Sequence, residues 1–319
     1  GKRFRALMAH VGYALSSGTA LDQVSLPHLS ASLELYQASA LVHDDIIDKA
    51  DERRGMPTPH RTLAHHHASS SWIGSSTDFG RHAAILVGDF LFSAATAAAD
   101  EQALNLREDC ARAFARRFAD MHAEVALGQY LDITAEQTPL DPQRTDALST
   151  SDSLEVALHK SAHYSVVHPA ILGAICGAST FDGVAELLAV LETILTPWGL
   201  AFQLRDDDLG VFGDPTVTGK PAGDDLREGK RTALLALTWE ASSPAERRAL
   251  TDVLGVVEAS AEQIATATDI VARNGRAAHE AEIARLVADG DAALEASTFD
   301  EDARAMLREL CSILTARRA

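Results

Sequence analysis

The stretch Leu41-Val42-His43-Asp44-Asp45-Ile46-Ile47-Asp48 places three carboxylates in an otherwise apolar segment. In a helix, Asp44 and Asp48 are one turn apart and lie on the same face. A second acidic group, Asp206-Asp207-Asp208, follows the apolar run Trp198-Gly199-Leu200-Ala201-Phe202-Gln203. Because unpaired carboxylates are costly in apolar surroundings, the two groups predict a site for hard cations beside a hydrophobic chamber.

The composition favours one large helical domain. The chain has 319 residues, of which 46% are hydrophobic and only 5% aromatic. Strands prefer β-branched and aromatic residues, so a chain dominated by Ala and Leu predicts an all-α fold, a large helical bundle. No Pro/Gly/Ser linker or abrupt change of composition divides the sequence, and we expect a single domain over residues 1–319.

Charge and cysteine content limit the partners and the compartment. The net charge of 28 − 46 = −18 argues against nucleic acid or an anionic membrane as partner. Three widely spaced cysteines (Cys110, Cys176 and Cys311) suggest reduced packing residues in a cytoplasmic protein. We expect no stretch to be apolar for long enough to span a bilayer, and so no stable membrane insertion. Because the chain starts at Gly1 rather than Met, we expect it to begin inside a longer parent sequence that carries another N-terminal helix.

Helical periodicity and the positions of Gly and Pro predict the order of elements. We expect helices over residues 2–16, 28–49, 82–100, 101–132, 151–166, 168–179, 183–209 and 231–241, and amphipathic helices over 244–317, broken near Gly275 and Gly290. The inner stripe of helix 28–49 is expected to comprise Leu33, Tyr36, Gln37, Ala40, Leu41, Asp44 and Asp48. Residues 60–81, rich in His, Ser and Gly, are expected to form a mobile surface loop, and residues 210–230 a charged connection.

Basic residues flank both acidic groups. They are Lys2, Arg3, Arg5, Arg53, Arg54, Lys160, Lys220, Lys230 and Arg231. Each of them alone is better explained as a surface salt-bridge partner. Taken together in so acidic a protein, they indicate phosphate binding, for which Arg forks and Lys point charges are both suited. The acidic groups offer oxygen ligands, which favours Mg²⁺ over zinc.

With these motifs, the sequence resembles the trans-type polyprenyl diphosphate synthases, which join isoprenoid units head to tail. The residues that carry the resemblance are Gly1 to Arg5, the DDxxD of Asp44 to Asp48 with Arg53-Arg54-Gly55, Gly88-Asp89-Phe90-Leu91, Gly128-Gln129 with Asp132, Lys160-Ser161, Phe202 to Asp207, Phe212 to Pro215, Gly219-Lys220-Pro221 and Gly229 to Thr232. They occur in family order over roughly residues 1–232, and such an ordered set is far more specific than a lone DDxxD.

The resemblance implies an all-α isoprenoid synthase fold, usually a homodimer, and a role for each matching residue. Asp44, Asp48 and Asp206, supported by Asp45 and Asp207, would bind three Mg²⁺ ions. Arg53, Lys160, Lys220 and Lys230 would hold the allylic diphosphate, and Lys2, Arg5, Gln37 and Arg54 isopentenyl diphosphate. Ser161 and Gln203 would lie near the developing allylic cation. The chemistry agrees, because metal and Lys/Arg charges stabilise a departing diphosphate and a carbocation needs a dry chamber.

Three positions depart from the family pattern. Gly210 stands where the second DDxxD usually has its last Asp, and we expect activity to survive because Asp206 remains. Gln37 stands where many bacterial members have His, and both side chains can donate a hydrogen bond to phosphate. Ser161 replaces the more usual Thr and keeps the hydroxyl.

The resemblance implies that residues upstream of the first acidic group control product length. Ser39 and Ala40 are small there, whereas a farnesyl-specific member typically has a bulky residue, so the cavity should run deeper. Tyr36 is two turns from Asp44, about 12 Å along a helix axis. It could floor the cavity and favour a geranylgeranyl product, or simply pack in the core. Phe90 is a second candidate for the floor, and a farnesyl or longer-chain product is the alternative.

Two rival functions predict different residues. A class I terpene cyclase shares the fold and the first acidic motif, but it should carry Asn/Asp-x-x-Ser/Thr-x-x-x-Glu on the later helix, where this chain has Gln203-x-x-Asp206-Asp207. A non-catalytic regulatory subunit tends to lose its Asp-rich motifs, and here both are largely present. The residues therefore favour a prenyltransferase.

Overall fold

A computed structural model describes residues 3–213, 223–256 and 258–315 of the chain. These residues are mostly helical, as the composition predicts, and the strands found among them are β1 (Glu52–Arg53) and β2 (Met56–Pro57). The chain divides into two compact units: unit 1 comprises Gly1–Phe118 and Leu172–Val184, and unit 2 comprises Ala119–Ile171 and Ala185–Ala319. The single domain expected from the sequence stays a prediction.

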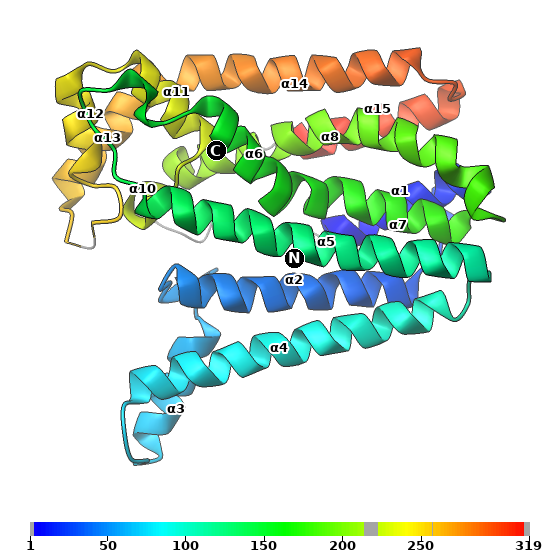
Figure 1. Cartoon of the computed structure of the whole chain (residues 1–319), viewed down its shortest axis with the longest axis horizontal. Helices are drawn as coiled ribbons and strands as arrows, with labels where there is room; N and C mark the ends of the chain where they lie inside the picture. The colour runs from blue at the N-terminus through cyan, green and yellow to red at the C-terminus, as the bar shows by residue number, and fades with distance from the viewer. Residues whose placement is uncertain (1–2, 214–222, 257, 316–319) are drawn as a thin grey trace. The chain divides into compact units, whose positions relative to one another are not determined.

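Most helices follow the expected order, but Pro59–Ser69 and Asp224–Glu228 are helices in ranges that were expected to be a loop and a charged connection (Figure 1). Unit 1 contains α1 (Phe4–Ser17), a 3₁₀ turn (Leu21–Gln23), α2 (Pro27–Ile47), α3 (Pro59–Ser69) and α4 (Ser76–Ala103). Unit 2 contains a 3₁₀ turn (Thr145–Ala147), α6 (Thr150–Ala157), a π-helical segment (Leu158–Val167), α10 (Asp224–Glu228), α11 (Ala233–Ala241), α12 (Pro244–Thr251), α13 (Ala261–Asn274), α14 (Arg276–Ala296) and α15 (Glu301–Thr315). Helices α5 (Glu108–Gln137), α7 (His168–Gly177) and α8 (Phe181–Phe212) contribute residues to both units.

In unit 1, α2 and α4 lie side by side (Figure 1). Two buried serines of α2 connect them: Ser32 Oγ donates to the carbonyl of Ala95 and Ser39 Oγ to that of Gly88, both at 2.8 Å. A Cβ at Gly88 would overlap the His43 ring, so the helices can approach this closely only with glycine there. The small residues of α2 and α4 therefore set the spacing of the helix pair that carries the first acidic motif.

The buried stripe of α2 differs from the expected one. Leu33 and Tyr36 are buried as predicted, but Gln37, Ala40, Leu41, Asp44 and Asp48 are only half-buried. The fully buried positions of α2 are instead Leu29, Ser32, Leu33, Tyr36, Ser39, Val42 and Asp45. The reason is the close packing on α4, which selects the face that carries the serines. The face with Asp44 and Asp48 stays accessible.

The expectation of a loop over residues 60–81 is wrong. Helices α3 and α4 together occupy most of this range. Helix α4 begins at Ser76, and Ser75 Oγ accepts a hydrogen bond from the Asp78 amide at 3.2 Å. The buried ring of His67 packs against those of Trp72 and Phe79, with centroids 5.7 and 4.9 Å away. The polar composition concealed a small aromatic cluster that stabilises the turn between the two helices.

Two apolar clusters lie among the described residues of unit 2. One joins α11, α12 and α13 around Trp239, and the other joins α8, α11 and α14 around Leu204. The predicted break at Gly275 is confirmed, since α13 ends at Asn274. The break predicted at Gly290 is wrong, because α14 continues through it. A Cβ at Gly290 would overlap the Trp198 indole, so this glycine serves helix packing rather than helix termination.

The expectation that no stretch is apolar for long enough to span a bilayer also needs correction. By length and composition alone, α4 and α8 could do so. Two such helices are weak grounds for a membrane protein, because the core helices of other proteins pass the same test.

Candidate active site

The first acidic motif ends helix α2 in unit 1. Asp45 is 1% exposed, whereas Asp44 and Asp48 are half-buried and reachable. Arg53 Nε donates to Asp45 Oδ1 at 2.6 Å, and Arg53 Nη2 to Asp44 Oδ2 at 3.3 Å. The motif therefore combines oxygen ligands with a held guanidinium, which suits both a cation and a phosphate oxygen.

A hairpin with a two-residue turn brings the Arg53 side chain back to the carboxylates of Asp44 and Asp45. Strands β1 and β2 pair antiparallel, and the two turn residues Arg54 and Gly55 both have positive φ, 55° and 71°. This is the backbone that a tight hairpin turn requires at both central positions. Arg54 is exposed, so the turn directs one arginine inward and leaves the other in solvent.

Burial and charge set the ionisation of this group. Desolvation is the largest influence on Asp45 and raises its pKa, and the nearby Arg53 guanidinium only partly offsets it. For Arg53 itself, desolvation is the largest single influence and would lower the pKa, but the charge and hydrogen bond of Asp45, together with the charges of the other two aspartates of the motif, outweigh it and raise the pKa of the guanidinium. Arg53 therefore stays charged, and a cation beside Asp45 would favour its ionised form.

The residues expected to control product length lie in unit 1. Tyr36 is 6% exposed and packs edge-to-face on Phe92, with ring centroids 6.0 Å apart. Ser39 is buried through its bond to α4, and Ala40 is half-buried. Phe90 is 73% exposed, which makes it a weaker candidate for a cavity floor than Tyr36.

The second acidic motif ends helix α8 in unit 2. Asp206 is exposed, and buried Asp207 accepts a hydrogen bond from Gln203 Nε2 at 2.8 Å. Asp208 is 2% exposed and accepts two hydrogen bonds from Arg276, both 3.0 Å long. Asp208 therefore joins α8 to α14, and Asp206 and Asp207 are the candidates for metal binding.

Asp225 occupies the space beside Gly210. A Cβ placed on Gly210 would overlap the Asp225 carboxylate, so the departure from the DDxxD pattern leaves room that another acidic residue fills. Asp207 lies close enough to Asp225 for the two carboxylates to repel each other. Burial raises the pKa of Asp207 well above its usual range, and repulsion from Asp225 is the next largest cause. The second motif thus has carboxylates from α8 and α10.

Lysines also converge in unit 2. Lys160 Nζ, in the π-helical segment, donates to Asp132 Oδ2 at 2.5 Å, and Lys230 Nζ lies 3.4 Å from the same oxygen. Lys230 also pairs with Glu136 at 2.9 Å. Desolvation would raise the pKa of buried Asp132, but the two lysines outweigh it and lower that pKa. The structure therefore brings together two of the predicted phosphate-binding cations.

Three of the remaining predicted residues lie on three different elements, and two are not described. Arg5 on α1, Gln37 on α2 and Ser161 in the π-helical segment are half-buried. Lys2 and Lys220 lie outside the described residues.

Sequence reasoning missed Asp225 and a cluster around Glu124. The signal for Asp225 is its place in Gly223-Asp224-Asp225-Leu226, shortly after the missing carboxylate at position 210. In the cluster, desolvation would raise the pKa of the Glu124 carboxyl, but hydrogen bonds with three histidines hold it far below its usual range. The signal there is the four-residue spacing of His159 and His163.

Together the helices and the two acidic motifs define an enzyme with the isoprenoid synthase fold. The chain belongs to the polyprenyl synthetase family, whose model matches residues 1–271, and it is a prenyltransferase. The resemblance noted from the motifs is thereby confirmed.

Relatives support the same family. The chain is 32% identical over 277 residues to a geranylfarnesyl diphosphate synthase of Aeropyrum pernix, a match that covers 86% of this chain and 76% of that protein. It is 31% identical over 316 residues to a geranylgeranyl diphosphate synthase of Mycobacterium tuberculosis, covering 98% and 79%. Among solved structures, the geranylgeranyl pyrophosphate synthase of Corynebacterium glutamicum, complexed with isoprenyl diphosphate and magnesium, is 38% identical, with a TM-score of 0.87 and coverage of 100% and 87%.

Proposed function

We propose that this enzyme condenses isopentenyl diphosphate with an allylic diphosphate to give a trans-polyprenyl diphosphate. The proposed main product is geranylgeranyl diphosphate. The observation that carries the proposal is the pairing of carboxylates with cations: Arg53 bonds to Asp44 and Asp45, and two lysines share Asp132. Carboxylates for a metal beside Arg and Lys for phosphate oxygens are what a metal-bound diphosphate requires. The relatives named geranylgeranyl diphosphate synthases support the choice of product.

The two acidic motifs fit Mg²⁺ by their ligands. Asp44, Asp45 and Asp48 in unit 1, and Asp206, Asp207 and Asp225 in unit 2, offer the oxygen atoms that Mg²⁺ prefers. We propose that they hold three ions when diphosphate is bound, with Asp225 in place of the carboxylate that Gly210 lacks. Bound Mg²⁺ supplies positive charge that stabilises a leaving diphosphate.

The cations divide between the two substrates. Arg53, Lys160, Lys220 and Lys230 bind the allylic diphosphate in this proposal, and Lys2, Arg5, Gln37 and Arg54 bind isopentenyl diphosphate. When the diphosphate binds, Lys160 and Lys230 give up part of their contact with Asp132 and bind phosphate oxygens instead. Because Asp132 is buried, it holds the lysine side chains in place and reduces the entropy lost on binding.

The remaining roles concern the carbocation. Ser161 and Gln203 lie at its developing charge in this proposal, and the hydrogen bond from Gln203 to Asp207 holds the amide in place. After C–C bond formation, the departing diphosphate accepts the proton that is lost. Tyr36 limits product length, with Ser39 and Ala40 leaving room above it.

We further propose a cytoplasmic homodimer. Helix α4 exposes Leu86 and Phe90 at 68% and 73%, and an apolar face of this kind is typical of protein contacts. A second copy of the chain would cover it. Light scattering of wild type and of Leu86→Glu would test this, with a change from dimer to monomer expected and an unchanged mass contradicting the role of α4.

The decisive experiment for the activity is incubation of purified protein with labelled isopentenyl diphosphate, Mg²⁺ and dimethylallyl, geranyl or farnesyl diphosphate, followed by analysis of chain length. Asp48→Asn should lower product formation by more than about 100-fold, because even outer partners of a metal contribute about 10–100-fold. Asp152→Asn, on the exposed first turn of α6, is the matched control. No elongation from any primer would refute the proposal, farnesyl or longer products would revise the chain length, and a cyclic hydrocarbon formed without isopentenyl diphosphate would identify a terpene cyclase.

A further inference from the structure

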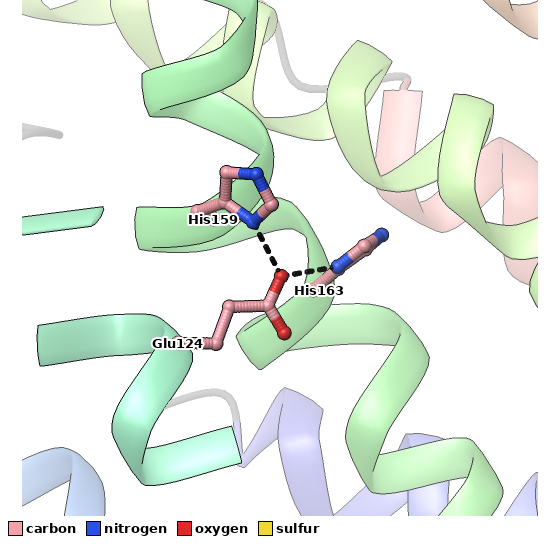
Figure 2. Close-up of side chains that lie close together, drawn as sticks. All are labelled: Glu124, His159 and His163. Atoms are coloured by element: carbon pink, nitrogen blue, oxygen red, sulfur yellow. Dashed lines mark hydrogen bonds and ion pairs between the residues drawn. The ribbon is translucent and has the colours of Figure 1, made fainter. Parts of the chain in front are cut away.

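A glutamate and two histidines of unit 2 converge beside Lys160, and none of the three was among the predicted site residues. Glu124 on α5 points toward His159 and His163 of the π-helical segment (Figure 2). His159 Nδ1 and His163 Nδ1 each lie 2.6 Å from Glu124 Oε1. One possible ligand atom from each of the three residues falls within 4.8 Å of the other two.

The π-helical backbone explains the convergence. Its hydrogen bonds join residues five apart, so side chains four and five positions apart share a face. His159, His163 and His168 have this spacing. On the other side, a Cβ at Gly128 would overlap the backbone of His159 and Lys160, so α5 and the segment approach closely one turn after Glu124.

Two further residues orient the cluster. His168 is 3% exposed, and its Nε2 lies 2.6 Å from Glu124 Oε2, which fixes the carboxylate. Thr196 Oγ1 lies 3.5 Å from His163 Nε2, the ring nitrogen that faces away from Glu124. Outer contacts of this kind fix the orientation and tautomer of histidines that bind metals.

We propose that Glu124, His159 and His163 form a Zn²⁺ site. Two imidazoles and a carboxylate form a common tetrahedral zinc set with one open position, whereas Mg²⁺ prefers oxygen. At ligand distances of about 2.0–2.1 Å, tetrahedral ligand atoms are about 3.3 Å apart, so the 2.6 Å separations need to widen by less than about 1 Å. The side chains are 19–28% exposed, which leaves the ion a way in.

The ion would tie α5 to the π-helical segment next to Lys160. The bound ion would position the segment that carries Lys160 rather than bind substrate, since none of its three ligands belongs to the proposed diphosphate-binding residues. The alternative is a cluster held by hydrogen bonds alone, with one carboxylate oxygen accepting from two imidazoles. The two possibilities differ in a measurable way, and the difference does not depend on the proposed function.

The test measures Zn²⁺ binding by the full chain, stripped with chelator and kept in excess Mg²⁺ so that the acidic motifs are occupied. Competition with a chromophoric chelator should give one Zn²⁺ per chain for wild type and for His65→Gln, an exposed control on α3. Glu124→Gln and His163→Gln should bind at least ten times more weakly. Zn²⁺ should raise the melting temperature of wild type and the control, but not of these variants.

Cobalt provides a readout that needs no variant. Co²⁺ in the wild-type site should show the visible absorption of a tetrahedral nitrogen and oxygen set, and Zn²⁺ should abolish it. The absence of stoichiometric binding, or equal affinity in wild type, Glu124→Gln and His163→Gln, would overturn the proposal. Circular dichroism of the metal-free variants separates lost binding from lost folding.

Discussion

Gly210→Ala tests whether Asp225 replaces the missing aspartate of the second motif. In most helix interiors this change stabilises a protein by about 0.5–1 kcal/mol. Here the new methyl group would overlap the Asp225 carboxylate, and overpacking costs about 1–3 kcal/mol. The free energy of unfolding should therefore range from no change to a loss of about 2.5 kcal/mol, opposite to the usual gain. Gly183→Ala in the first turn of α8 is a milder control, since its Cβ would crowd a single side-chain atom, the Thr180 hydroxyl at 2.9 Å, whereas a Cβ at Gly210 would overlap the Asp225 carboxylate.

The effect on activity follows from the displaced carboxylate. Contacts around a metal contribute about 10–100-fold, so kcat/KM should fall by that factor, equivalent to about 1.4–2.7 kcal/mol in the barrier. The Mg²⁺ concentration needed for half-maximal rate should rise as well. Initial rates of product formation, measured at fixed saturating primer over a series of Mg²⁺ concentrations, check both expectations.

The double variant Gly210→Asp/Asp225→Ala tests whether a carboxylate at position 210 can replace that of Asp225. Removing the Asp225 carboxylate vacates the space, and an aspartate at position 210 restores the usual motif. We expect the double variant to be at least ten times more active than either single variant. If Gly210→Ala keeps wild-type kcat/KM and Mg²⁺ dependence, or if the double variant is no better than both singles, Asp225 does not have this role.

Three further outcomes are expected. Tyr36→Ala should lengthen the products seen by chain-length analysis, and an unchanged distribution would remove Tyr36 as the floor. Ser39→Ala should lower the free energy of unfolding by about 0.5–1.5 kcal/mol in urea titrations, because the Gly88 carbonyl loses its buried donor. Burial, the largest cause, lowers the pKa of His279 to about 4, so its contribution to stability is present above pH 6.5 and is lost as pH falls toward 4. Wild type should therefore lose about 1.4 kcal/mol more than His279→Leu between pH 8 and pH 5.5, and parallel pH profiles would contradict this.

Much of the fold, the family and a set of candidate site residues could be predicted from local patterns, and the roles of those residues stay predictions. Composition and periodicity predict the all-α class and most helices, because a helix forms from contacts within one segment and one apolar face. The ordered motifs, with Asp44 to Asp48 and Lys160 among them, identify the family that the comparisons then show. Local signals failed where polar residues concealed packing, as in α3, which was expected to be a loop.

Contacts between distant segments could be known only from the tertiary structure. The role of Gly290 depends on Trp198, and that of Gly210 on Asp225. Likewise, Lys160 and Lys230 meet at Asp132, and Glu124 meets two histidines through the wider turn of a π-helical segment. The sequence by itself determines which residue types are present and the helical faces that carry them. Their partners are decided by the packing of separate helices, because hydrogen bonds and charges act over a few ångströms in space, whatever the separation along the chain.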